Sequence, residues 1–130
     1  MTTASAILII DDDQVLTELY RSKFEKEGYA VTVCHDGQQG FDTLRGGLKP
    51  DVIVLDLMMP VMDGITFLRE ASYKLRLPPI IVMTSQDQDA KKLEALIHGA
   101  HAYVIKAQVT PMDLLEQIRL LLSPQGTRKS

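Results

Sequence analysis

Five short apolar runs, separated by stretches with helical spacing, constrain the fold of this chain more than any other feature. The runs cover 7–10, 30–34, 52–55, 80–83 and 102–105, and most are rich in β-branched residues. Runs of this length are too short for buried helices and are typical of buried strands. Strands that are apolar on both faces and alternate with helices predict a parallel sheet with helices on both sides.

Helix start signals support this division. Asp36 and Gln39 form a capping-box pattern that predicts the start of the second helix. Thr110, Pro111 and Asp113 supply a cap, a first-turn proline and a first-turn acid for the fifth helix. The order is therefore strand then helix, five times over.

Length and charge limit the other possibilities. A chain of 130 residues, 45% of them apolar, can bury one core, so we expect a single domain over 1–130 with its core at about 6–122 and a loose tail at 123–130. The net charge of −3 argues against direct nucleic-acid binding. No apolar run approaches the roughly 20 residues of a membrane span, and no secretion signal opens the chain, so we expect a cytoplasmic protein.

Cys34, the single cysteine, is interpreted as a buried structural thiol.

Polar residues follow four of the five apolar runs. Asp11 and Asp12 follow the first run, Asp56 the third, Thr84 the fourth and Lys106 the fifth. Ligands of open parallel sheets bind at the carboxyl ends of the strands, where the strand order reverses. We therefore expect these side chains to converge.

The charge of this set selects its ligand. Two carboxylates about 4 Å apart repel by about 4 kcal/mol at an effective dielectric constant of 20, which favours protonation or a bound cation. Three aspartates at 11–13 would repel the phosphate of a flavin. Oxygen ligands without nearby His or Cys favour a hard ion, and Mg²⁺ suits a site with few carboxylates.

A bound Mg²⁺ gives Asp56 a second possible role. A carboxylate is already ionised at neutral pH, so it can attack a phosphoryl group without a general base. Phosphoryl transfer depends chiefly on positioning and on neutralising the developing charge. The Lys106 ammonium can supply positive charge, and the Thr84 hydroxyl can donate to a phosphoryl oxygen.

With these residues assembled, the chain resembles the receiver domains of bacterial two-component response regulators over about 6–122. The segments that carry the resemblance are IIDDD, VLDLMMPVMDG, IIVMTS and GAHAYVIKA, in that order. The resemblance implies a three-layer (βα)₅ flavodoxin-like, doubly wound α/β fold. Its five-stranded parallel sheet would have the order 2-1-3-4-5.

The resemblance also implies roles for the acidic residues. Asp56 would be the phosphoacceptor, and Asp11, Asp12 and Asp56 would bind Mg²⁺ together with the backbone carbonyl of Met58. The donor would be a histidine kinase or a histidine phosphotransfer protein.

Three further residues take roles by the same resemblance. Thr84 and Lys106 would bind the phosphoryl group, and Thr84 and Tyr103 would form the switch. The fourth helix, fifth strand and fifth helix would present a face to a downstream effector domain or protein.

The chain departs from the family pattern at Ala107 and Gln108, where proline and an aromatic residue are usual. The sequence therefore leaves open whether the Lys106–Ala107 peptide bond is cis or trans.

Two alternatives stay open at this point. One is an Mg²⁺-dependent phosphohydrolase with an aspartyl nucleophile, although Met58 occupies the position where such enzymes carry a second acid. The other is a receiver-shaped interaction module that is never phosphorylated. A receiver would not be an enzyme in the usual sense, because it would catalyse only its own phosphorylation and dephosphorylation.

The remaining polar residues have simpler interpretations. Asp13 is predicted to cap the helix that opens at Gln14. His35, His98 and His101 are interpreted as solvated or helix-end residues.

Overall fold

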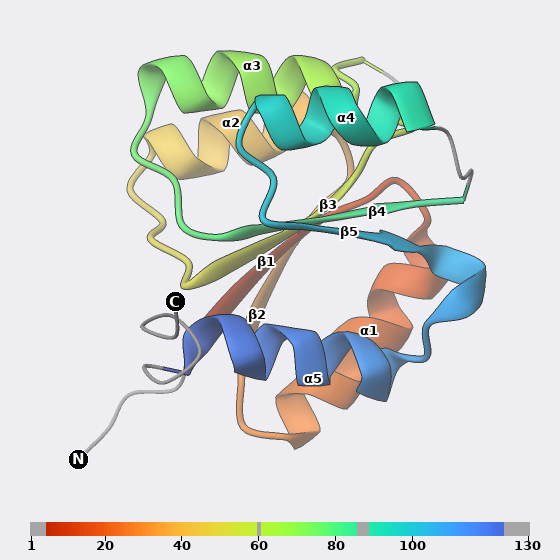
Figure 1. Ribbon diagram of the computed structural model, residues 1–130. Coiled ribbons are helices and arrows are strands. Elements are labelled where there is room, and N and C mark those ends of the chain that lie inside the picture. Colours follow the sequence, from red (N-terminus) through yellow and green to blue (C-terminus); the bar gives the residue numbers. More distant parts are fainter. Residues whose placement is uncertain (1–4, 60, 86–88, 124–130) are drawn as a thin grey trace.

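The computed structural model describes residues 5–59, 61–85 and 89–123, in which five strands alternate with five α-helices (Figure 1). The strands are β1 (Ala6–Ile10), β2 (Ala30–Cys34), β3 (Val52–Asp56), β4 (Ile80–Thr84) and β5 (Ala102–Ile105). The helices are α1 (Gln14–Lys26), α2 (Gly37–Arg45), α3 (Gly64–Lys74), α4 (Asp89–Ile97) and α5 (Pro111–Leu122), with a 3₁₀ turn, η1 (Lys106–Gln108), before α5. Apart from Ser123, the tail predicted at 123–130 lies outside the described residues.

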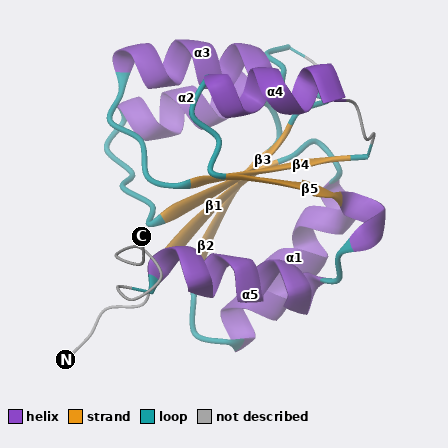
Figure 2. Ribbon diagram, viewed as in Figure 1, coloured by secondary structure: helices purple, strands orange, loops and turns teal. Residues whose placement is uncertain are grey.

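The five strands form one parallel sheet in the order β2-β1-β3-β4-β5, which confirms the predicted topology. Helices α1 and α5 cover one face of the sheet, and α2, α3 and α4 cover the other (Figure 2). The strand order reverses between β1 and β3, because the chain runs from β1 to β2 at one edge and then crosses to β3 on the other side of β1. Across the described part of the chain, no helix has both the length and the apolar character needed to cross a membrane.

The core has two layers because alternate strand residues point to opposite faces of the sheet. Leu8, Ile10 and Cys34 belong to the layer that contacts α2 and α3, whereas Ile7 and Ile9 belong to the layer that contacts α1 and α5. The prediction of a buried thiol at Cys34 is confirmed, and burial raises its pKa. Both layers are fully apolar along β1, which explains why this strand has no polar alternation.

Side chains cap the helices largely as predicted. Asp13 Oδ1 accepts a hydrogen bond from the Leu16 N–H at 3.0 Å, so the prediction of a helix cap is confirmed. Asp36 caps α2 at the Gln39 N–H. The Gln39 side chain, however, accepts from the His35 N–H rather than from Asp36, so the second half of the predicted capping box is displaced by one residue.

Candidate functional site

The predicted convergence of polar side chains is confirmed by the register of the strands. Asp56 and Thr84 are the last residues of β3 and β4, while Asp11 and Lys106 directly follow β1 and β5. Parallel pairing places the ends of these four strands side by side, with Asp56 opposite Met83. Residues far apart in the sequence therefore meet at one edge of the sheet.

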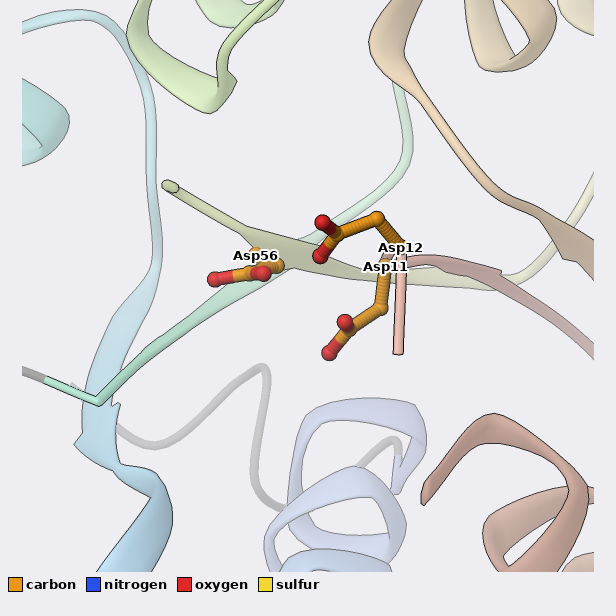
Figure 3. Close-up of side chains that lie close together, drawn as sticks. All are labelled: Asp11, Asp12 and Asp56. Carbon is orange, nitrogen blue, oxygen red and sulfur yellow. The ribbon is translucent and has the colours of Figure 1, made fainter. Parts of the chain in front are cut away.

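Three carboxylates form an acidic pocket at this edge (Figure 3). Asp11, Asp12 and Asp56 each offer an oxygen, and these atoms lie within 4.8 Å of one another. Asp11 and Asp56 are 2% and 4% exposed, whereas Asp12 is exposed to solvent. Two carboxylates are thus held inside the protein, and a third is open to the medium.

The Lys106 ammonium lies between the two buried carboxylates. Its Nζ is 2.8 Å from Asp11 Oδ2 and 3.4 Å from Asp56 Oδ2. A buried carboxylate pair requires positive charge nearby, since desolvation and mutual repulsion both disfavour the ionised forms. Lys106 supplies one such charge from the position that follows β5, across the intervening strand β4.

The remaining carboxylate oxygens are held by the backbone in the same way at both positions. Asp11 Oδ1 accepts from the Asp13 N–H at 3.0 Å, and Asp56 Oδ1 accepts from the Met58 N–H at 3.2 Å. In each case the donor lies two residues further on, and Oδ2 faces Lys106. Both carboxylates are therefore fixed in orientation. This was not predicted from the sequence, although an aspartate that accepts from the backbone N–H two residues further on is the common Asx-turn pattern.

The titration of the site follows from this geometry. Burial and the charge of Asp11 raise the pKa of Asp56 from 3.8 to about 6, despite the opposing effect of Lys106. Burial alone would lower the pKa of Lys106, but its hydrogen bond to Asp11 and the charges of Asp11 and Asp56 raise it. The lysine therefore stays charged, and Asp56 ionises at a higher pH than an ordinary aspartate.

Two glycines permit close approaches of the backbone around the loop between β3 and α3. A Cβ on Gly64 would lie 2.6 Å from Leu57 Cα and 2.7 Å from the Asp56 carbonyl oxygen. A Cβ on Gly37 would lie 2.4 Å from the Met62 carbonyl oxygen. The loop between β3 and α3 can therefore fold against the end of β3 only where side chains are absent.

Thr84 and Tyr103 lie on the β4–β5 side of the site. Thr84 is buried at the end of β4 and is paired in register with Ile105, next to Lys106. Tyr103 is half-buried against the α2–α4 core layer, and its ring centroid lies 6.0 Å from Lys92 Nζ. The switch pair predicted from the resemblance thus occupies neighbouring strands.

The peptide bond between Lys106 and Ala107 is trans, which resolves the alternative left open by the sequence. The chain turns here through the 3₁₀ turn η1. Ala107 and Gln108 are exposed. The departures from the usual sequence leave the lysine ammonium within reach of both buried carboxylates.

Two of the histidines have specific contacts that their sequence context does not indicate. His35 Nδ1 lies 3.3 Å from the Asp11 carbonyl oxygen, and His101 Nδ1 accepts from the Ile80 N–H at 3.2 Å. His35 therefore supports the backbone of the acidic pocket, and His101 extends the pairing of β4 and β5. Neither ring points to chemistry of its own.

The donor set fits a hard divalent cation. It consists of carboxylate oxygens, with two of the carboxylates held in fixed orientation and the third exposed where an ion would enter. Mg²⁺ is commonly bound by one or two carboxylates and retains water and phosphate ligands. The pocket formed by Asp11, Asp12 and Asp56 is therefore compatible with Mg²⁺ binding.

Fold and site together define a class of small parallel α/β domains with an acidic pocket where the strand order reverses. Within this class, the chain belongs to the response regulator receiver domain family, whose family model matches residues 7–119. It is a receiver domain of two-component signalling systems, as the resemblance in its sequence predicts.

Relatives of known identity agree with this assignment. The chain is 34% identical over 116 residues to the response regulator MprA of Mycobacterium avium, covering 89% of this chain and 50% of the relative. It has the same identity to protein RcaC of Microchaete diplosiphon, of which it covers 18%. The chain thus spans half or less of the length of these curated relatives.

Solved structures agree on the fold. The receiver domain of the Francisella response regulator 1452 has a TM-score of 0.82 and 30% identity, covering 91% of this chain and 96% of that one. The BeF₃-activated N-terminal receiver domain of Klebsiella pneumoniae RstA has the same TM-score and identity, covering 91% and 98%. A CheY-like receiver domain protein from Methanospirillum hungatei has a TM-score of 0.88 and 26% identity, covering 98% of this chain and 100% of that one.

Proposed function

We propose that the chain is a phosphorylatable switch in which Asp56 accepts a phosphoryl group from a phosphohistidine of a partner. The observation that carries this proposal is the position of Lys106, whose ammonium contacts both Asp56 and Asp11. A positive charge beside an oriented carboxylate is the arrangement that phosphoryl transfer to that carboxylate requires.

The proposed step is an in-line transfer between two side chains. An oxygen of the Asp56 carboxylate attacks phosphorus, and a new O–P bond forms while the N–P bond of the donor breaks. The electron pair of the N–P bond returns to the imidazole, which carries a proton on its other nitrogen and leaves as neutral imidazole. No general base is needed, because the attacking carboxylate has a pKa of about 6 and is therefore mostly ionised at neutral pH.

Three further groups would act on the phosphoryl oxygens. Lys106 would pair with one oxygen in place of its longer contact to Asp56, while it keeps its contact to Asp11. The Thr84 hydroxyl would donate to another, since Thr84 ends the strand next to Asp56. Mg²⁺ held by Asp11, Asp12, Asp56 and the Met58 carbonyl would neutralise the charge that develops during transfer.

We propose that a histidine kinase or a histidine phosphotransfer protein supplies the phosphoryl group in the cytoplasm. The output would pass through the face formed by α4, β5 and α5. Leu93 and Ile97 on α4 are 60% and 70% exposed, which supplies apolar surface for a downstream effector. Contacts of Thr84 and Tyr103 that change on phosphorylation would shift this face toward a second conformation. The phosphoryl group can shift the populations of the two conformations only through contacts that differ between them.

The phosphohydrolase alternative is not favoured. Its second acid would lie two residues after the nucleophile, where the structure has the Met58 side chain. At that position the polar contact to Asp56 comes from the Met58 backbone N–H. Catalysis would therefore be limited to the chain's own phosphorylation and dephosphorylation.

Incubation with Mg²⁺ and acetyl phosphate, followed by intact mass measurement, tests the proposal. We expect one phosphoryl adduct on the wild-type protein and none on Asp56→Asn. Asp51→Asn is a matched control, because Asp51 is an exposed aspartate that bonds to the Ala6 N–H outside the pocket. An adduct that persists in Asp56→Asn would overturn the assignment.

A further inference from the structure

A cavity of about 550 Å³ lies at the end of the sheet opposite the acidic pocket. It is formed by the segments that connect α2 to β3 and α3 to β4, which descend toward the sheet at the left of Figure 1. Residues 52 and 56 of β3 are separated by ~13 Å at 3.3 Å per residue. A ligand in this cavity would therefore not contact Asp56.

The walls of the cavity are mainly apolar. Leu44, Leu48, Leu75 and Leu77 are half-buried, line the cavity and pack on the α2–α4 core layer. Its volume falls within the range of about 300–1,000 Å³ that is typical of small-molecule sites. Half-buried leucines at an opening in the core favour an apolar ligand that removes their exposed surface from water.

The same cavity carries two cations at its rim. Lys49 and Arg76 line it and are exposed, and within the described part of the chain neither forms an ion pair. The nearby cations Arg45 and Lys74 lie over the Phe41 ring instead. In a chain with a net charge of −3, this leaves local positive charge beside apolar walls.

The acidic residue closest in sequence to this rim does not neutralise it. Asp51 follows Lys49 by two positions, but its Oδ2 accepts from the Ala6 N–H at 2.7 Å. Its carboxylate is therefore directed toward β1. Positive charge and apolar walls thus select a ligand with one apolar body and one negative group.

A second, smaller cavity adjoins the larger one. It has a volume of about 190 Å³ and shares Leu75, Leu77 and Pro78 with the larger one. It continues toward Ile80, at the start of β4, and His101, which directly precedes β5. The two cavities therefore adjoin along the three residues that they share.

We propose that the larger cavity binds a small amphipathic carboxylate, with its apolar chain against the four leucines and its carboxylate between Lys49 and Arg76. The ligand class follows from the two cations and the leucine walls. The site is separate from the proposed phosphorylation site, so ligand binding should survive Asp56→Asn.

Titration with decanoate below its micelle concentration tests the proposal on protein with ¹³C-labelled leucine methyl groups. We expect saturable shifts of Leu44, Leu48, Leu75 and Leu77, also in Asp56→Asn. Decylamine, with the same chain and the opposite charge, should bind at least fivefold more weakly, and decanol should bind with intermediate affinity. Equal affinity for the acid and the amine would overturn the ligand class.

A matched pair of double variants tests the role of the rim cations. Lys49→Glu with Arg76→Glu should weaken decanoate binding about fivefold, as expected for two exposed ion pairs. Lys23→Glu with Lys26→Glu makes the same charge change on α1 and should leave binding within about twofold. Equal losses of decanoate affinity in both double variants would show that binding depends on the net charge of the protein, and would overturn the role of Lys49 and Arg76. Shifts confined to Leu93 and Leu96 on α4, or no shifts at all, would overturn the site itself.

Discussion

The Lys106 ammonium is closer to Asp11 than to Asp56, with Nζ–Oδ2 distances of 2.8 and 3.4 Å. The lysine is therefore held chiefly by a carboxylate that does not need to react. A phosphoryl group arriving on Asp56 would compete only for its longer contact. This geometry keeps the Lys106 ammonium at the site, and its contact with the proposed nucleophile, Asp56, is the longer of the two.

Replacing Lys106 by methionine should separate cation binding from phosphoryl transfer. The variant loses a positive charge beside two proposed Mg²⁺ ligands, so Mg²⁺ affinity should rise about tenfold by relief of repulsion. Phosphorylation by acetyl phosphate should slow at least tenfold, because the ammonium no longer neutralises the phosphoryl oxygens. Calorimetric Mg²⁺ titration and time-resolved intact mass measure the two effects.

Lys106→Arg is the control for this prediction, since it keeps the charge. Its Mg²⁺ affinity should stay within about threefold of the wild type. If Lys106→Met weakened both Mg²⁺ binding and transfer, the lysine would be only a structural support of the pocket.

The raised pKa of Asp56 predicts a pH-dependent gain in stability for Asp56→Asn. The carboxyl ionises at about 6 in the folded protein and at 3.8 in its ordinary environment, so its charge destabilises the fold above pH 6. Below about pH 4 it is protonated in both states and costs nothing. Without Mg²⁺, urea unfolding near pH 7.5 should therefore show Asp56→Asn more stable by on the order of 2–3 kcal/mol.

The gain should shrink steadily as the pH falls from about 6 toward 4. It should also shrink when Mg²⁺ is added, because the ion stabilises the wild type selectively. A variant that is less stable than the wild type near pH 7.5 would contradict the raised pKa.

The three consecutive aspartates should respond differently to removal. Asp12 contributes an oxygen to the acidic pocket, so Asp12→Ala should weaken Mg²⁺ binding about tenfold or more. Asp13 caps α1 instead, so Asp13→Ala should cost about 1 kcal/mol of stability and leave Mg²⁺ affinity within about twofold. Mg²⁺ titration and urea unfolding of both variants measure this. Equal loss of Mg²⁺ binding would mean that the aspartates act as one cluster.

Val61 stores backbone strain in the loop that follows β3. Its φ is 67°, a left-handed conformation that β-branched residues rarely adopt, and its side chain is 83% exposed. Val61→Asn should therefore stabilise the protein by about 1 kcal/mol in urea unfolding, since asparagine tolerates this conformation. Val15→Asn is a matched control at 84% exposure within α1, and it should give no gain. A loss of stability in Val61→Asn would disprove the strain.

The fold was predictable from sequence because each element carries its own local signal. Apolar runs mark the strands, and Asp13, Asp36 and Thr110 mark helix starts through hydrogen bonds that span only three residues. The convergence of the site residues follows from parallel pairing alone. The strand order itself depended on the family resemblance, since nothing in the apolar runs distinguishes one central strand from another.

Other features could not be predicted because they depend on tertiary distances. Helical spacing places Leu93 and Ile97 on α4, but it does not show that both are exposed. Lys106 Nζ lies closer to Asp11 than to Asp56, at 2.8 and 3.4 Å, and a difference this small leaves no trace in the sequence. The contact of His35 with the Asp11 carbonyl joins β2 to β1 and has no local motif.

The most direct test of the central claim identifies the phosphorylated residue itself. After incubation with Mg²⁺ and acetyl phosphate, borohydride reduces an aspartyl phosphate to homoserine, which peptide mass spectrometry locates in the sequence. We expect homoserine at position 56 only, and only when Mg²⁺ and the phosphodonor are both present. Homoserine at position 11 or 12, or none at position 56, would contradict this claim.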